Sequence, residues 1–432
     1  MKTVLMIACC VPVLAAQPAD DTQLRQVIIV SRHGVRTPLQ PNSALDVFSA
    51  APYPELTDPV SYLTANGTRL ETMLGTYYRL WLKREGLLTG QDSSDAAFVY
   101  FRALNLERTV ATAQAFAAAL LPSAAVNVDF QRTGSDPLFD PVGAGISPMD
   151  YQKAAAAVSG RIGNDPQAFA SGWASELSLA RATLFQYPAS RIPLPATPAG
   201  KIDATALPMT ATAGDPGNWP VVLGGLSATE NAVSPFFMQY ADGLPASAVA
   251  WGQLSLAGIG QTMRLTTLVL DLECRTPYLD RVQSSNLASH VVRSIAQAAT
   301  GTATAGSLAS PSTRVIVLVA SDVNVAGLAG LFHLNWLVPG YPADFCAPGG
   351  ALVFELRQSQ RTGEFVVRAS YVAQTPDQLR NRSAMTLDKP PATAPLFIPG
   401  CSTGDPTFDC PLADFVRVAN GAMDPSSADL VH

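Results

Sequence analysis

The sequence predicts an α/β fold, a three-layer α/β/α sandwich with a mostly parallel central sheet and a mostly helical inserted domain. Two short runs, residues 26–31 (QVIIVS) and 314–320 (RVIVLVA), are almost continuously apolar and rich in β-branched residues, as strands buried on both faces of a parallel sheet are. After the second run the apolar spacing changes to that of a helix. A chain of 432 residues is also long enough for a main domain plus an insertion.

Further strands and helices complete the predicted core. One of the predicted helices, over residues 107–121, ends before Pro122 because proline cannot continue a helix. The polar residues between the last two predicted strands are typical of a turn that joins an antiparallel pair. These core elements are helices over residues 60–85 and 107–121 and strands over residues 97–102, 351–357 and 364–373.

The middle of the chain has a different pattern. Residues 143–250 lack runs typical of buried strands, show helical spacing over residues 149–159 and 169–185, and then become rich in proline. We interpret them as a mostly helical insertion, or cap domain. The core is then discontinuous and comprises residues 17–142 and 251–432.

The first residues are predicted to be a targeting segment. Lys2, an apolar stretch and small residues before a polar break predict a signal peptide over residues 1–16 and a periplasmic or secreted mature protein. A first buried strand is the alternative. Lipid attachment at Cys9 or Cys10 has less support, because little apolar sequence precedes either residue. No other stretch is apolar enough to span a membrane, so no membrane contact is expected after cleavage.

Four cysteines follow this segment. Cys401 and Cys410 lie close together among glycine and proline residues, which predicts one local disulfide in an oxidising compartment. Pairing of Cys274 with Cys346 stays open. No histidine and cysteine grouping has the spacing of a zinc site, so no metal is expected.

The overall charge limits the partners. The formal net charge is −6, which argues against a nucleic-acid partner. An acidic protein that binds phosphate must do so through a local arginine cluster, because its global field repels anions.

Such a cluster follows the first predicted strand, in RHGVRTP. Arg32, His33 and Arg36 come directly after the carboxyl end of the strand, where open α/β sheets place their ligands. Guanidinium groups bind phosphoryl oxygens and offset the charge that builds as a histidine attacks phosphorus, and Gly34 lets the backbone approach the anion. The alternative is a packed histidine beside two surface arginines.

The motif RHGxRxP resembles the signature of the histidine acid phosphatases. This resemblance implies that His33 is the nucleophile, forming a phosphohistidine, and that Arg32 and Arg36 bind phosphate. The segment NLERTVATAQAF, residues 105–116, is similar to a second block of the family, which implies a third phosphate ligand at Arg108. Blocks such as SDPLFDPV, QYADGLPASAVAWG and LNWLVPGYPADFCAPGGALVFEL extend the resemblance over nearly all of the mature chain. Without it, Arg108 would be interpreted as a solvated helix residue.

The second predicted buried strand ends at a departure from the family. A His-Asp pair stands there in the family, but this chain has Ser321 and Asp322. The resemblance implies that Asp322 protonates the leaving oxygen and that Ser321 takes the place of a phosphate-binding histidine. The exchange forfeits a charge-assisted hydrogen bond, roughly 1–2 kcal/mol or about five- to thirtyfold in rate or affinity. The alternative role for both residues is capping of the following helix.

The resemblance also bears on the substrate. Phytases of the bacterial branch follow the motif's proline with threonine and lysine, whereas this chain has Leu39 and Gln40, which is more similar to the glucose-1-phosphatases. A small phosphomonoester with one phosphate, such as glucose 1-phosphate, is therefore expected, with no cofactor. Phytase activity on inositol phosphates and a weakly active or non-catalytic phosphate-binding protein are the alternatives. A phosphoglycerate-mutase-like phosphotransferase has less support, and the oligomeric state stays open.

Overall fold

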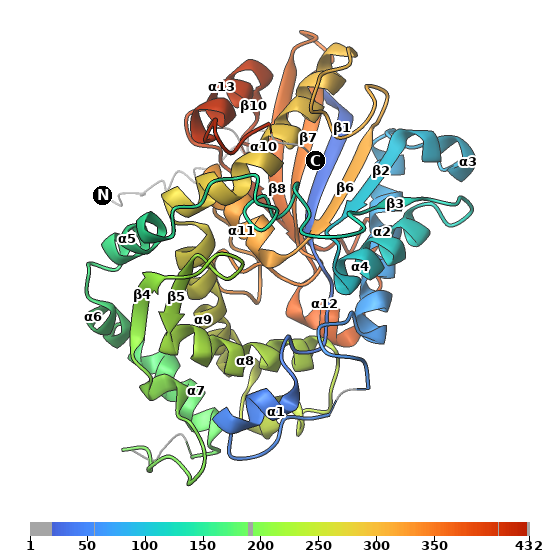
Figure 1. The fold of residues 1–432 in the computed structure, drawn as a ribbon. Coiled ribbons are helices and arrows are strands. Elements are labelled where there is room, and N and C mark those ends of the chain that lie inside the picture. The colour runs from blue at the N-terminus through green and yellow to red at the C-terminus, as the bar shows by residue number, and fades with distance from the viewer. Residues whose placement is uncertain (1–19, 56, 189–192, 405, 430–432) are drawn as a thin grey trace, which may run out of the picture.

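The computed structural model of the chain describes residues 20–429 except residues 56, 189–192 and 405 (Figure 1). The predicted signal peptide, residues 1–16, lies outside the described residues, so its cleavage stays a prediction. In the part that the structure describes, no helix is both long and apolar enough to cross a membrane.

One eight-stranded sheet organises the larger part of the molecule. Its strand order is β10-β8-β7-β1-β6-β2-β3, and β9 also pairs with β8. The neighbours β1, β6, β2 and β3 run parallel, whereas β7 is antiparallel to β1 and to β8. The strands are β1 (Thr22–Arg32), β2 (Val99–Ala103), β3 (Val128–Asp129), β6 (Val315–Ala320), β7 (Ala351–Ser359), β8 (Phe365–Ala373), β9 (Ala392–Leu396) and β10 (Cys410–Pro411).

Helices cover both faces of this sheet, which gives the three predicted layers (Figure 1). Side chains alternate between the faces of a strand, and β1 shows the consequence. Ile28 and Val30 belong to the apolar core with α10, α11 and α13, whereas Val27 and Ile29 belong to the core with α2 and α4. The covering helices are α2 (Ala65–Arg84), α4 (Glu107–Leu120), α10 (Pro277–Thr300), α11 (Asp322–Leu331) and α13 (Leu412–Ala422).

The region predicted to be an insertion lies beside the sheet and below its carboxyl edge in Figure 1. Its helices pack on a third apolar core, which also takes in residues of α9 (Leu256–Cys274). The proline-rich stretch contains a hairpin that the sequence analysis did not predict, β4 (Met209–Ala213) with β5 (Val221–Gly224). The domain boundary at residue 250 stays a prediction. The helices are α5 (Tyr151–Arg161), α6 (Pro166–Ser171), α7 (Ala174–Leu184) and α8 (Gly225–Ala241).

Short helical segments occupy several connections of the fold. They are α1 (Asn42–Leu45), α3 (Asp92–Asp95) and α12 (Pro376–Asn381), with 3-10 turns over Asp46–Phe48, Ala96–Phe98, Ala204–Ala206 and Val249–Gly252.

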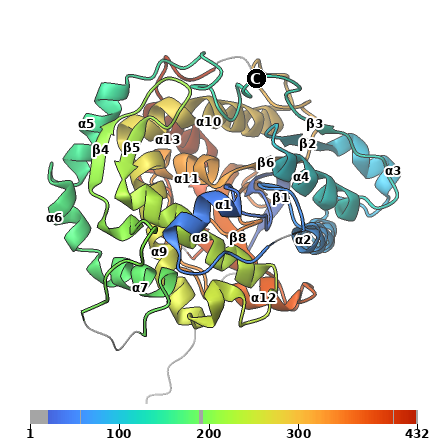
Figure 2. The same ribbon diagram turned by 60° about the horizontal axis from the view of Figure 1, so that its bottom comes forward.

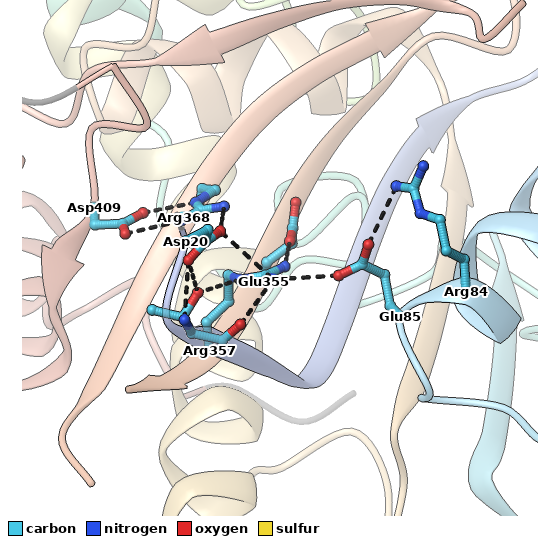
Figure 3. A network of polar contacts seen from close by, with 8 residues as sticks. Asp20, Arg84, Glu85, Glu355, Arg357, Arg368 and Asp409 are labelled. Atoms are coloured by element: carbon cyan, nitrogen blue, oxygen red, sulfur yellow. Dashed lines mark hydrogen bonds and ion pairs between the residues drawn. The ribbon is translucent and has the colours of Figure 1, made fainter. Parts of the chain in front are cut away.

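A network of ion pairs joins the start of β1 to the neighbouring strands (Figure 3). Arg368 on β8 pairs with Asp20 at 2.8 Å and with Asp409 at 2.7 Å. Arg357 on β7 pairs with Glu85, at the end of α2, at 3.2 Å. Both arginines are largely buried, so their charges need these partners. The network lies at the end of β1 opposite to the RHGVRTP segment.

The predicted local disulfide is present between Cys401 and Cys410. It joins the start of β10 to the loop after β9. Cys274 and Cys346 are both buried and unbonded to each other.

Candidate active site

The parallel pairing of β1 with β6 brings the two predicted motifs to one edge of the sheet. Arg32, the last residue of β1, is in register with Ala320, the last residue of β6. The backbone N–H of His33 donates to the Ala320 carbonyl at 2.9 Å. Ser321 and Asp322 follow directly, so the segments that carry His33 and Asp322 leave the sheet side by side.

A local hydrogen bond sets the orientation of the His33 ring. Nδ1 lies 2.8 Å from the carbonyl oxygen of Gly34, a partner that can only accept, so Nδ1 carries the proton. Nε2 then keeps its lone pair and is the nitrogen that can attack. The backbone N–H of Gly34 donates to Thr112 Oγ1 at 3.0 Å, which fixes the turn against α4.

Only glycine fits at this turn. A Cβ atom at Gly34 would lie 2.6 Å from Glu71 Oε1, and one at Gly349 would lie 2.5 Å from the same oxygen. Glu71 is itself 1% exposed and cannot move away into solvent. Burial raises the pKa of Glu71 to about 8, so this carboxyl group packs beneath the turn as a neutral acid at acidic and neutral pH.

Three arginines surround His33, two from the RHGVRTP segment and one from α4. Arg32 Nη1 donates to the Cys346 carbonyl at 2.5 Å, and Arg36 Nη1 donates to the carbonyl of Thr37 at 2.9 Å. Arg108, in the first turn of α4, donates from Nη1 to Ser61 Oγ at 2.5 Å. These contacts fix each guanidinium group at one end.

Some of the other N–H donors of these guanidinium groups have no hydrogen-bond partner in the described part of the chain. Among them are the buried Nε atoms of Arg32, Arg36 and Arg108. A buried donor without a partner is costly, and a buried cation more so. An anion with several oxygen acceptors, such as a phosphoryl group, is the kind of ligand that would relieve both costs.

The electrostatics of the cluster keep His33 neutral. Burial lowers the pKa of His33 well below its usual value, and Arg32, Arg36 and Arg108 lower it further. Burial and the neighbouring guanidinium groups also lower the pKa of Arg36 to about 9. An imidazole in this setting retains a nucleophilic lone pair even at acidic pH, where an ordinary histidine would be protonated.

Asp322 lies against the same cluster as the first residue of α11. Its Oδ2 pairs with Arg32 Nη2 at 2.8 Å. Burial raises the pKa of Asp322, but Arg32, Arg36 and Arg108 together outweigh burial and lower it overall. Without a ligand, Asp322 is therefore an ionised carboxylate that partly neutralises the arginines.

Ser321 caps α11. Its Oγ donates to Asn324 Oδ1 at 3.1 Å, and its backbone N–H donates to the same oxygen at 3.2 Å. Asn324 Nδ2 in turn donates to the carbonyl of Phe139 at 2.7 Å. The capping interpretation of Ser321 therefore has a structural basis, and its role as a phosphate ligand stays a prediction.

A pocket of about 190 Å³ opens beside this cluster. Arg32, Arg36 and Asp322 line it from the sheet edge. Helix α9 packs against both α11 and α8, and all three lie in the same part of the molecule in Figure 2. Side chains of α8 and α9 form the facing wall of the pocket. Two of the wall residues, Glu230 and Glu273, escaped the sequence analysis. The only signal for them was a glutamate within each apolar helical pattern.

Two other histidines, His290 and His333, are not among the residues that line this pocket. His290, on α10, contacts the Gly306 carbonyl through Nδ1, and His333 follows the end of α11. The described residues contain no group of three or more histidine, cysteine, aspartate or glutamate side chains arranged to hold a metal ion.

A neutral histidine among three arginines and a carboxylate, at the carboxyl edge of an α/β sheet, is typical of enzymes that transfer phosphoryl groups. Comparison of the chain with known proteins indicates the same class of enzyme. The profile of the histidine phosphatase superfamily (branch 2) matches residues 23–188. The glucose-1-phosphatase of Salmonella typhimurium (strain LT2) is 30% identical over 414 residues, which cover 95% of each chain.

Phytases are similar to the chain as well. Phytase AppA of Escherichia coli (strain K12) is 28% identical over 414 residues, 95% of this chain and 94% of that one. The solved structure of Hafnia alvei phytase in complex with tartrate superposes with a TM-score of 0.82 at 30% identity, covering 95% of this chain and 99% of that chain. The chain belongs to branch 2 of the histidine phosphatase superfamily, the histidine acid phosphatases. It is a phosphatase, and it is about equally similar to phytase AppA, at 28% identity, and to the Salmonella typhimurium glucose-1-phosphatase, at 30%.

Proposed function

We propose that the protein is an exported acid phosphatase that hydrolyses phosphomonoesters through a phosphohistidine on His33. The observation that carries the proposal is the buried His33 ring among Arg32, Arg36 and Arg108, with Nδ1 held by the Gly34 carbonyl so that Nε2 keeps its lone pair. Burial and the three arginines lower the pKa of this ring. Export rests on the signal peptide predicted over residues 1–16 and gives a periplasmic or secreted enzyme.

The first chemical step forms one bond and breaks another. His33 Nε2 attacks phosphorus, the bond from phosphorus to the ester oxygen breaks, and the leaving oxygen takes a proton from Asp322. The three guanidinium groups hold the phosphoryl oxygens and offset their charge. Water then attacks phosphorus, Asp322 accepts its proton, and His33 is released with inorganic phosphate.

Asp322 must gain a proton before it can act as an acid. In the free site its pairing with Arg32 opposes protonation. A bound phosphoryl group competes for Arg32 and places negative charge beside the carboxylate, and both effects raise its pKa. Below about pH 6 a phosphomonoester also binds as a monoanion that brings a proton of its own.

The favoured substrate carries one phosphate, as glucose 1-phosphate does. Leu39 and Gln40 line the pocket where a phytase resembling this motif would offer threonine and lysine, so this edge supplies no cation for a second phosphate. Phytase-type activity is the second candidate, and the similarity to AppA and to Hafnia alvei phytase supports it.

The test is phosphate release between pH 3 and 8 from glucose 1-phosphate, phytate and p-nitrophenyl phosphate. We expect turnover at acidic pH that favours glucose 1-phosphate and is lost in His33→Ala, with label trapped on His33 after an acid quench. Retention of more than a few per cent of the activity in His33→Ala would contradict the mechanism. Phosphate binding without turnover would instead identify a binding protein.

A further inference from the structure

The wall of the pocket that faces the arginines carries two carboxyl groups. Glu230 lies on α8 and Glu273 near the end of α9, and both line the same pocket as Arg32, Arg36 and Asp322. Glu273 is 6% exposed and Glu230 is partly buried. Burial of acidic side chains at a site for an anionic substrate is unexpected unless they act on some other part of that substrate.

Among the described residues, neither carboxyl group is held in an ion pair, although Arg36 and Arg32 act on Glu230 from a distance. These two arginines are the only cations in the described lining of the pocket. Glu230 accepts a hydrogen bond from Thr266 Oγ1 at 2.9 Å. Away from the arginines, the pocket thus offers carboxyl and neutral polar groups to a ligand, but no positive charge.

The wall also offers neutral polar groups. The Ser227 hydroxyl, one turn from Glu230 on α8, is buried and lies next to the Glu273 carboxyl group, whose pKa it lowers through a hydrogen bond. The remaining polar residues of the wall are neutral, namely Asn231, Ser234, Thr262 and Thr266. Such a surface matches the hydroxyl groups of a sugar, which both donate and accept.

A second phosphate would fit badly against the same wall. Its charge would lose water, would find no cation and would face the carboxyl groups of Glu230 and Glu273. We propose that Glu230 and Glu273 are specificity-determining residues, which accept an uncharged, hydroxyl-rich leaving group such as a sugar and reject substrates that carry a second phosphate. This inference rests on the proposed phosphatase function and names the part of the pocket that selects the substrate.

The pH alters how the wall acts. Burial raises the pKa of Glu273 to about 8, and the charge of Glu230 adds to this effect. Burial also raises the pKa of Glu230, with Asp322 acting in the same direction and Arg36 and Arg32 against it. At acidic pH the wall therefore consists of neutral acids that can donate to sugar hydroxyls, and charge repulsion of a second phosphate grows as the pH rises.

The test compares two substrates that differ by one phosphate, glucose 1-phosphate and glucose 1,6-bisphosphate. The measured quantity is the ratio of kcat/KM for the bisphosphate to kcat/KM for the monophosphate, at pH 4.5, pH 7 and pH 8.5. The variants are Glu230→Gln, Glu273→Gln and the double variant, because glutamine keeps the size and hydrogen bonding but cannot ionise. Glu364→Gln, at the exposed turn between β7 and β8, is the control.

We expect the wild-type ratio to be well below one and to fall further between pH 7 and pH 8.5, where the Glu273 carboxyl group ionises. The double variant should raise the ratio at pH 8.5 by about tenfold or more and lose most of this pH dependence, whereas Glu364→Gln should leave it unchanged. An unchanged ratio in the double variant, with hydrolysis of p-nitrophenyl phosphate retained, would overturn the inference and leave the phosphatase function intact.

Binding provides a readout that does not need turnover. On a His33→Ala background, calorimetry gives the Kd of both sugar phosphates with and without the double substitution. The expected shift in the ratio of the two Kd values is the same as for kcat/KM. A wild-type protein that binds both ligands but hydrolyses neither would refute the proposed function, and the Kd ratios would still decide for or against the acidic wall.

Discussion

Asp322→Asn separates the two effects that Asp322 has on the site. The substitution removes a negative charge that pairs with Arg32 at 2.8 Å and faces all three guanidinium groups. Asparagine has nearly the same shape and can still accept a hydrogen bond from Arg32, so the local packing should survive. It cannot protonate a leaving oxygen at any pH.

The two effects should have opposite signs. Loss of the proton donor should lower kcat for glucose 1-phosphate by about 10²–10³-fold, the usual range for a general acid. Loss of the carboxylate also removes repulsion of roughly 3 kcal/mol per unit of phosphate charge, taking a separation of about 5 Å and an effective dielectric constant near 20. Solvent screening reduces this figure, so we expect inorganic phosphate to inhibit the variant about tenfold more strongly.

Comparing glucose 1-phosphate with p-nitrophenyl phosphate shows whether a loss of kcat comes from the loss of the proton donor. p-Nitrophenolate departs without a proton, so kcat for p-nitrophenyl phosphate should fall by less than about tenfold in Asp322→Asn. Asp271→Asn breaks the partly exposed ion pair with Arg161 and serves as the control, with neither effect expected. Equal losses on the two substrates, or weaker inhibition by phosphate, would refute the role given to Asp322.

Three further outcomes test other parts of the structure. Ser321→His should raise kcat/KM by about five- to thirtyfold by restoring a charge-assisted hydrogen bond, and loss of activity in a folded variant would show that Ser321 matters only as the cap of α11. Gly34→Ala should destabilise the fold by about 1–3 kcal/mol in urea unfolding, because its Cβ would meet Glu71 Oε1. Adding Glu71→Ala should recover part of this loss, and strictly additive effects would argue against that contact. Asp20 has a pKa lowered overall, because its hydrogen bonds with Arg368 and Thr22 outweigh its burial. The Asp20 carboxylate stabilises the fold fully above about pH 4, the pKa of an aspartate in the unfolded chain, and this contribution is lost as the pH falls. The Tm of Asp20→Asn should therefore lie below that of the wild type at pH 6, and the two Tm values should converge toward pH 2.

The position of the site could be predicted because its parts follow buried strands. Continuous apolar runs ended at Ser31 and at Ala320, and the carboxyl ends of parallel strands meet at one edge of a sheet. From this alone, His33 and Asp322 are expected to lie close together. Arg108 was different, because its place in a helix is also typical of a solvated residue, and only the resemblance to a known family singled it out.

Other features depend on tertiary packing and left little trace in the sequence. The hairpin of β4 and β5 is short, and its strand MTATA is only partly buried. Proline residues around the hairpin interrupt the alternation of apolar and polar residues that would predict a strand. Glu230 and Glu273 lie on different helices and meet at one pocket only because α8 packs against α9. No periodicity within either helix indicates that pairing.

The charges of the pocket define a direction for the substrate. The chain has a formal net charge of −6, yet two buried guanidinium groups and one half-buried guanidinium group gather at the end of β1, and burial together with their mutual repulsion holds the pKa of Arg36 near 9. Such a cluster is stable only when anionic groups offset it, which Asp322 does in part and a phosphoryl group would complete. Across the pocket the proposed wall of Glu230 and Glu273 opposes a second anion. A phosphomonoester can satisfy both ends only with its phosphate at His33 and its hydroxyl groups against α8 and α9. In this orientation we expect the ester oxygen to face Asp322, the first residue of α11 and the proposed proton donor.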